Sequence, residues 1–154
     1  MIIKIISIGN KLNSWELDSI NYYLKQIPKN LKIDFINLKS QQNPNYSESE
    51  VIIKESKLIM SKISKDDFVV AFDIKGNQMS SKKFSDLIFD CFKTSKVLTF
   101  IIGGSFGLSS EIKDNSNRVL SASLFTFPHR LFRLLLIEQI YRAHTIKNNM
   151  PYHK

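Results

Sequence analysis

Short apolar runs alternate along this chain with stretches that have the spacing of amphipathic helices. Five runs are predicted to be strands, because they are nearly continuously apolar or alternate apolar and polar residues: 2–8, 31–38, 68–72, 97–102 and 119–121. The stretches between and after them are predicted to be helices: 14–27, 47–63, 80–92, 109–115 and 128–146. This alternation predicts an α/β fold with a mostly parallel central sheet of about five strands flanked by helices.

Polar residues mark where several of these helices begin. Ser14 is expected to cap the first helix, and Ser47 with Glu50 three residues later forms the pattern of a capping box. Pro128 is expected in the first turn of the last helix, where proline is well tolerated. Neither a repeat nor a linker interrupts the pattern, so residues 1–154 are predicted to form a single domain.

Composition narrows the class of protein. With 43% hydrophobic and 23% charged residues, the 154-residue chain is typical of a globular protein. The lone cysteine, Cys91, excludes an internal disulfide framework and a zinc site built from several thiolates, and we expect no metal. The apolar opening is predicted to be a strand instead of a signal peptide, and no apolar run approaches the roughly 20 residues that span a bilayer. We therefore expect a cytoplasmic protein without a membrane partner.

Positive charge is concentrated at the C-terminal end. The chain has 22 lysines and arginines against 14 acidic residues, a net charge of +8. Residues 116–154 hold six of the basic residues against Glu138 alone, a net of +5, and they include every arginine and every histidine. Because arginine makes bidentate contacts with phosphate and stacks on bases, this segment favours a polyanionic partner, most simply RNA. A solvated basic surface is the alternative interpretation.

Three segments follow strands at the edge of the sheet where open parallel sheets bind ligands: 72–76, 103–108 and 121–127. The second is rich in glycine, but it matches neither Gly-x-Gly-x-x-Gly nor a phosphate-binding loop. The second strand also ends without the acidic residue that binds ribose in dinucleotide-binding folds. An ordinary nucleotide-binding enzyme is therefore disfavoured, and a plain turn is the alternative explanation of the glycines.

Several single residues have chemistry that fits a site. His129 begins the last helix, where the helix dipole disfavours the protonated imidazole. The ending Tyr152-His153-Lys154 combines a ring for base stacking, a proton acceptor and a phosphate contact, although a frayed end is the simpler interpretation. His144 is expected to be a packed or surface residue, and Cys91 a core residue.

Several motifs of the last third of the chain form a specific combination: Phe100-Ile-Ile-Gly-Gly-Ser-Phe-Gly-Leu108, Ser121-Ala-Ser123, Thr126-Phe-Pro-His129, Arg133, Leu136-Ile-Glu-Gln-Ile-Tyr-Arg-Ala143 and Pro151-Tyr-His-Lys154. With them the whole chain resembles the RlmH (YbeA) group of SPOUT methyltransferases. The resemblance is highly specific in the last third and loose in the first half, where it includes Gly9, Lys11, Trp15, and Asp73 with Gly76.

The resemblance implies a trefoil-knotted fold, with residues from about 100 to 154 forming the knot and the active-site tail. Members act as homodimers, bind S-adenosyl-L-methionine in the knot, and methylate N3 of a pseudouridine in a stem-loop of large-subunit (23S) ribosomal RNA on the assembled ribosome. Carried over by position, the implied cofactor-binding residues are Phe72, Gly103, Ala122, Ser123, Leu124, Phe125, Thr126 and Phe127. Phe72 replaces a leucine that is common in the family.

A physical mechanism that is consistent with this resemblance gives catalytic roles to the basic end. His153 and His129 are the candidate acceptors of the N3 proton, with His153 ahead because a tail can fold over a base; water is the alternative acceptor. Arg142 and Lys154 are expected to stabilise the developing anion, and Tyr152 to stack or hydrogen-bond. The rival hypothesis is a non-catalytic RNA-binding module that has lost cofactor binding.

Overall fold

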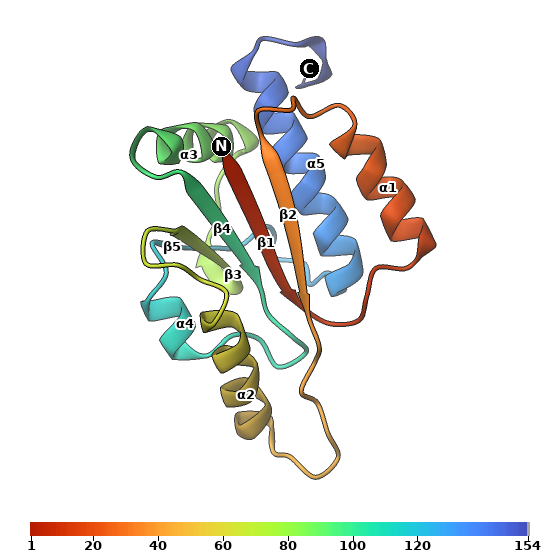
Figure 1. Cartoon of the computed structure of the whole chain (residues 1–154), viewed down its shortest axis with the longest axis vertical. Helices are drawn as coiled ribbons and strands as arrows, with labels where there is room; N and C mark the ends of the chain where they lie inside the picture. The colour runs from red at the N-terminus through yellow and green to blue at the C-terminus, as the bar shows by residue number, and fades with distance from the viewer. Residues whose placement is uncertain (154) are drawn as a thin grey trace.

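Five parallel strands form one sheet at the centre of the molecule (Figure 1). The structure is a computed structural model, and it describes residues 1–153. The strand order across the sheet is β2-β1-β4-β3-β5. The strands are β1 (Ile2–Ile8), β2 (Lys32–Leu38), β3 (Phe68–Asn77), β4 (Val97–Ile102) and β5 (Arg118–Leu120). The predicted α/β class and parallel sheet are confirmed.

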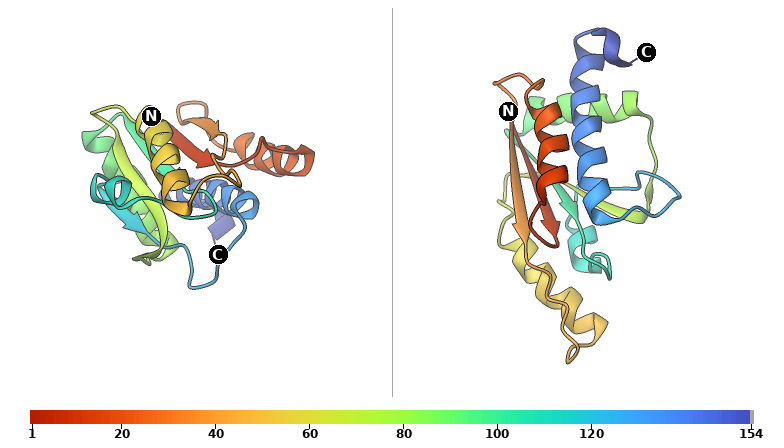
Figure 2. Two further views of the ribbon diagram at one scale, coloured as in Figure 1. Left: turned by 90° about the horizontal axis from the view of Figure 1, so that it is seen from below. Right: turned by 90° about the vertical axis from the view of Figure 1, so that its right-hand side faces the viewer.

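Helices cover both faces of this sheet. Their bounds are α1 (Ser14–Leu24), α2 (Glu48–Met60), α3 (Ser81–Thr94), α4 (Ser110–Asp114) and α5 (His129–Lys147), followed by the short 3-10 helix η1 (Pro151–His153). Helices α1, α3 and α5 pack together on one face, and α2 and α4 lie on the other (Figure 2). No helix within residues 1–153 is both long and apolar enough to cross a membrane.

The alternation of side chains along the strands gives the molecule two hydrophobic cores. In β1, Ile3 and Ile5 face α1, α3 and α5, while Ile6 and Ile8 face α2 and α4, and all four are buried. The larger core includes Cys91, as predicted, and burial raises the pKa of its thiol to about 11. Because both faces are covered, the strands are the nearly continuous apolar runs that the sequence shows.

Some element boundaries differ from the prediction. The first helix is capped by Asn13 instead of Ser14: Glu16 N donates to Asn13 Oδ1 at 3.3 Å, and Asn13 N donates to Glu16 Oε2 at 3.1 Å. The helix also ends at Leu24, earlier than predicted. The capping box of Ser47 and Glu50 is confirmed, with Ser47 N donating to Glu50 Oε2 at 2.7 Å.

Strand β3 is five residues longer than predicted because it pairs twice with the same residue of β5. Leu120 is opposite Phe72 and again opposite Asn77, so the residues between them bulge out of the ladder. Gly76 makes this possible, since a Cβ there would lie 2.4 Å from the carbonyl carbon of Leu120. The bulge places residues 73–76 beside the carboxyl ends of β4 and β5, where a cavity opens. The knot implied by the resemblance stays a prediction.

Candidate functional site

A cavity of about 500 Å³ lies at the carboxyl ends of the three strands β3, β4 and β5. Three segments form most of its wall: residues 72–75, 102–108 and 120–127 without Leu124. They are the segments that the sequence placed at this edge of the sheet, and the fold brings them together. His129 and Phe132 of α5 complete the wall, together with Lys113 of α4. A concave site at this position is where open α/β sheets bind ligands.

The glycine-rich turn after β4 brings main chain directly to the cavity. A Cβ at Gly103 would lie 2.9 Å from the carbonyl carbon of Gly107 and 3.0 Å from the side chain of Leu108, so the turn closes only around a glycine. Gly107 has a φ of 79°, in the left-handed region, and its N donates to Gly104 O at 3.0 Å. The turn therefore offers a ligand its backbone in place of side chains.

The loop after β5 folds by hydrogen bonds among its own serines. Ser121 Oγ donates to Ser123 O at 2.9 Å, and Phe125 N donates to Ser123 Oγ at 2.9 Å. This turn carries Leu124 to the tip of the loop, where it is 89% exposed and outside the cavity wall. The side chain of Leu124 thus does not line the cavity in this structure, and its contact with the cofactor stays a prediction. The other predicted residues of this loop, Ala122, Ser123, Phe125, Thr126 and Phe127, do line the cavity.

Aromatic rings form one wall of the cavity. Phe72 stacks on Phe100 with ring centroids 5.7 Å apart, and the Phe132 ring meets Phe72 edge-on at 4.9 Å. The larger side chain at position 72 is thus held by two other rings and still faces the cavity. An apolar wall of this kind suits a planar heteroaromatic ligand.

The cavity wall also contains an ion pair between Asp73 and Lys113, and the sequence did not predict that these two residues would meet. Asp73 Oδ2 and Lys113 Nζ lie 3.3 Å apart, and Asp73 Oδ1 accepts a hydrogen bond from Lys75 N at 2.9 Å. Lys113 carries no sequence signal that separates it from the other lysines, because only the fold brings α4 beside the bulge of β3.

His129 is half-buried on the cavity wall. Burial lowers the pKa of its imidazole, the positive charge of Arg133 lowers it further, and the negative charge of Glu55 acts in the opposite direction. The direction agrees with the helix-dipole argument, although burial is the main cause. A histidine with a lowered pKa is neutral near pH 7 and is able to accept a proton.

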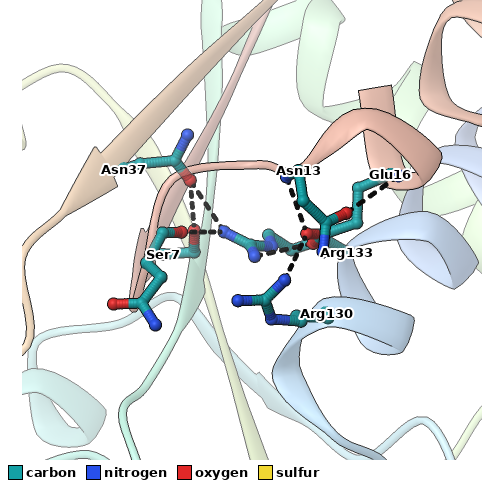
Figure 3. A network of polar contacts seen from close by, with 7 residues as sticks. Ser7, Asn13, Glu16, Asn37, Arg130 and Arg133 are labelled. Carbon is teal, nitrogen blue, oxygen red and sulfur yellow. Dashed lines mark hydrogen bonds and ion pairs between the residues drawn. The ribbon is translucent and has the colours of Figure 1, made fainter. Parts of the chain in front are cut away.

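A buried ion pair holds the start of α5, and with it His129. Arg133 is 1% exposed, and its NH2 donates to Glu16 Oε1 of the fully buried Glu16 at 2.7 Å (Figure 3). Arg133 NH1 donates to Asn37 Oδ1 at 3.0 Å and to Asn10 O at 3.2 Å. Arg130 NH1 reaches Glu16 Oε2 at 3.2 Å. These contacts tie α5 to α1 and to the ends of β1 and β2.

The predicted catalytic tail packs against the middle of α5, outside the cavity wall. Tyr152 Oη donates to Glu138 Oε1 at 3.0 Å, Arg142 pairs with the same carboxylate at 2.8 Å, and the Arg142 guanidinium lies 5.1 Å from the centre of the Tyr152 ring. Glu138 and Arg142 follow His129 in α5 by 9 and 13 residues, which at 1.5 Å per residue places them about 14 Å and about 20 Å along the helix from it, and neither Arg142 nor Tyr152 lines the cavity. One copy of the chain therefore does not bring Tyr152 or Arg142 to the cavity. The His153 side chain and Lys154 lie outside the described residues.

Comparison with known proteins identifies the class to which this fold and cavity belong. The family described as "predicted SPOUT methyltransferase" matches residues 1–153. The chain therefore belongs to the SPOUT methyltransferase family, as its motifs predicted.

Full-length relatives narrow the comparison further. Two proteins named ribosomal RNA large subunit methyltransferase H, from Bacillus cytotoxicus and Clostridium botulinum, are 44% and 41% identical to this chain over 160 and 159 residues. Ribosomal RNA large subunit methyltransferase H 1 from Clostridium perfringens is 42% identical over 159 residues. Each alignment covers the whole of this chain and of the relative. The resemblance to the RlmH group is confirmed.

The buried ion pair makes a prediction about stability. Arg133→Met leaves the Glu16 carboxylate buried without its main partner, so we expect the free energy of unfolding to fall by about 3–5 kcal/mol. Urea denaturation followed by circular dichroism measures it. The matched control is Arg118→Met, which removes an exposed arginine and is expected to change stability by less than about 0.5 kcal/mol. Equal effects of the two substitutions would contradict a structural role for the pair.

Proposed function

We propose that this protein transfers a methyl group from S-adenosyl-L-methionine to N3 of a pseudouridine in large-subunit (23S) ribosomal RNA, on the assembled ribosome in the cytoplasm. The observation that carries the proposal is the cavity built by the ends of β3, β4 and β5, in a chain 41–44% identical over its full length to named ribosomal RNA methyltransferases. The net charge of +8 suits an RNA substrate.

The residues of the cavity fit the proposed methyl donor. Phe72 offers an apolar ring face to adenine, and Gly103 lets the ligand approach main chain at a point where any side chain would be blocked. Backbone groups of residues 122–127 are available for hydrogen bonds to adenine and ribose. Bound there, S-adenosylmethionine supplies a methyl group that is already activated by its sulfonium.

With an activated donor, the protein has two tasks: to align the target base and to remove its proton. Alignment of the acceptor nitrogen with the methyl group is a positioning problem, which rigid loops at the end of a sheet solve well. For the proton, we propose His129, which lies on the cavity wall and whose lowered pKa keeps it neutral near pH 7. His153 of a second copy is the alternative acceptor.

The remote position of the tail supports the proposed homodimer. Within one chain the tail packs near the middle of α5 and the cavity opens at its start. If Tyr152, Arg142 and Lys154 act on the substrate, they must reach the cavity of another copy. The exposed apolar residues Trp15 on α1 and Leu131 on α5 provide surface for such a partner.

The rival hypothesis, an RNA-binding module without cofactor, differs in one measurable property. Such a module does not need the tight turn at the cavity wall, yet the turn is present here: a Cβ at Gly103 would collide with Gly107 and Leu108, and Gly107 has a φ of 79°. Binding of S-adenosylmethionine in calorimetry separates the two hypotheses, since the module would give no heat of binding.

Gly103→Val tests the proposed cofactor site. We expect loss of S-adenosylmethionine binding because the valine side chain collides with Gly107 and Leu108 at the cavity wall. Cells that carry only this variant are expected to lack the N3-methyl group in mass spectra of the 23S ribosomal RNA loop, whereas the wild-type gene restores it. The control is a circular dichroism spectrum equal to that of the wild type. Unchanged affinity would place the cofactor elsewhere.

Deletion of residues 152–154 tests the proposed role of the tail. The loss of base stacking, worth about 1–3 kcal/mol, is expected to lower the methylation rate by about 10- to 100-fold. Affinity for S-adenosylmethionine is expected to stay within about twofold, because the cavity of the same chain is untouched. Methylation at the full rate would show that the tail takes no part in the reaction.

A further inference from the structure

One carboxylate oxygen near the cavity is buried without a partner. Glu55 of α2 is 3% exposed, and no donor from the described part of the chain reaches its Oε2. Its other oxygen is fully engaged: Oε1 accepts hydrogen bonds from Ser40 Oγ at 3.1 Å and from Gln41 N at 3.0 Å. A buried acceptor without a hydrogen bond lowers the stability of the folded state, so unpaired acceptors of this kind are rare unless they have a function.

The unpaired oxygen points at the glycine turn that lines the cavity. A Cβ at Gly104 would lie 2.6 Å from Glu55 Oε2, and 2.9 Å from the side chain of Ile8. Gly104 thus leaves open the space into which the carboxylate projects, and Gly104 itself lies on the cavity wall. Only a glycine at this position lets a buried carboxylate approach the cavity from the α2 side of the sheet.

On the same cavity wall lies a half-buried imidazole that forms no side-chain hydrogen bond within the described residues: His129. The negative charge of Glu55 is close enough to raise the pKa of His129, against burial and Arg133, which lower it. Of the other charged residues on the wall, Asp73 and Lys113 pair with each other, and Lys75 is exposed. Glu55 is therefore the one carboxylate identified as acting on His129.

We propose that Glu55 is the positioning residue of His129: a change of side-chain rotamer would let its free Oε2 accept a hydrogen bond from one ring nitrogen, a bond that this structure does not contain, while the other ring nitrogen faces the substrate. This inference rests on the proposed function. A carboxylate that orients a histidine base and stabilises the imidazolium is a recurrent arrangement in proton-transfer sites. The unpaired Oε2 of Glu55, the glycine beside it at position 104 and the unpaired imidazole of His129 then serve the same proton transfer.

The balance of protons and charge in the methyl transfer explains why a carboxylate is useful beside His129. As the bond between N3 and the methyl carbon forms and the carbon–sulfur bond breaks, the N3 proton passes to the free ring nitrogen of His129. The positive charge that leaves the sulfonium reappears on the imidazolium, and the products are a neutral thioether and the N3-methylated base. The buried negative charge of Glu55 stabilises that imidazolium, with Arg133 acting against it.

The test substitutes Glu55→Gln, which keeps the shape and an oxygen for Ser40 and Gln41 but removes the charge. NMR titration of the His129 ring, assigned by its loss in His129→Gln, is expected to give a lower pKa than in the wild type. The acid limb of the kcat profile is expected to move to lower pH by the same amount. We also expect kcat to fall about tenfold, a part of the 10²–10⁴-fold that a general base supplies, with KM for the cofactor within about twofold.

Two controls separate charge from structure. Ser40→Ala loosens the loop held by Glu55 Oε1 but keeps the carboxylate, and Glu48→Gln removes an exposed charge from the same helix. Both are expected to leave the His129 titration unchanged. Glu55→Asp moves the carboxylate back by the length of one methylene group. It is expected to lower the pKa of His129 by less than Glu55→Gln does, and it replaces the glutamine variant if that variant does not fold.

The titration needs neither RNA nor cofactor, so its result is independent of the proposed function. If His129 titrates identically in the wild type and in the folded Glu55 variants, Glu55 only holds the loop and the inference is wrong, whether or not the protein methylates RNA. A shifted titration in a protein that methylates no ribosomal RNA would instead leave the pair standing and overturn the proposed function.

Discussion

The buried ion pair between Arg133 and Glu16 is the interaction on which the arrangement of this site depends. A fully buried glutamate and a guanidinium that is 1% exposed are stable only as partners, and each also completes other hydrogen bonds. Through them the first turn of α5 is fixed to α1 and to the ends of β1 and β2 (Figure 3). That first turn carries His129 on the cavity wall, so the pair fixes the position of His129, and the charge of Arg133 adds to the effect of burial in lowering the pKa of its imidazole.

The sequence was sufficient for the fold class and for the three segments at the cavity, because continuous apolar strands and strand-end loops are local patterns. Strands β1 and β4 were predicted residue for residue. The bulge in β3 was not predictable, since it arises from the double pairing of Leu120 across the sheet. Leu124 was assigned to the pocket by position in the motif, yet hydrogen bonds to Ser123 turn it outward.

Charged residues of the site were the hardest to predict, because their roles depend on distant parts of the chain. Arg133 was named only as one of the residues that carry the family resemblance, without a role, and its partner Glu16 lies 117 residues earlier. Glu55 showed only the pattern of a helix residue, and its unpaired oxygen is visible only once α2 is placed beside Gly104. The tail was recognised from its chemistry, but the sequence did not reveal that Tyr152 packs against the middle of α5, outside the cavity wall of the same chain.

Mixing two chains that are each impaired in methylation tests the central claim, which is that the cavity of one copy and the tail of another form one site. Gly103→Val keeps the tail and loses the cavity, and deletion of residues 152–154 does the reverse. When the two are co-expressed and the mixed dimer is purified by two affinity tags, we predict about half the methylation rate of the wild-type dimer, since one of two symmetric sites is rebuilt. A mixed dimer no more active than either parent would contradict the account.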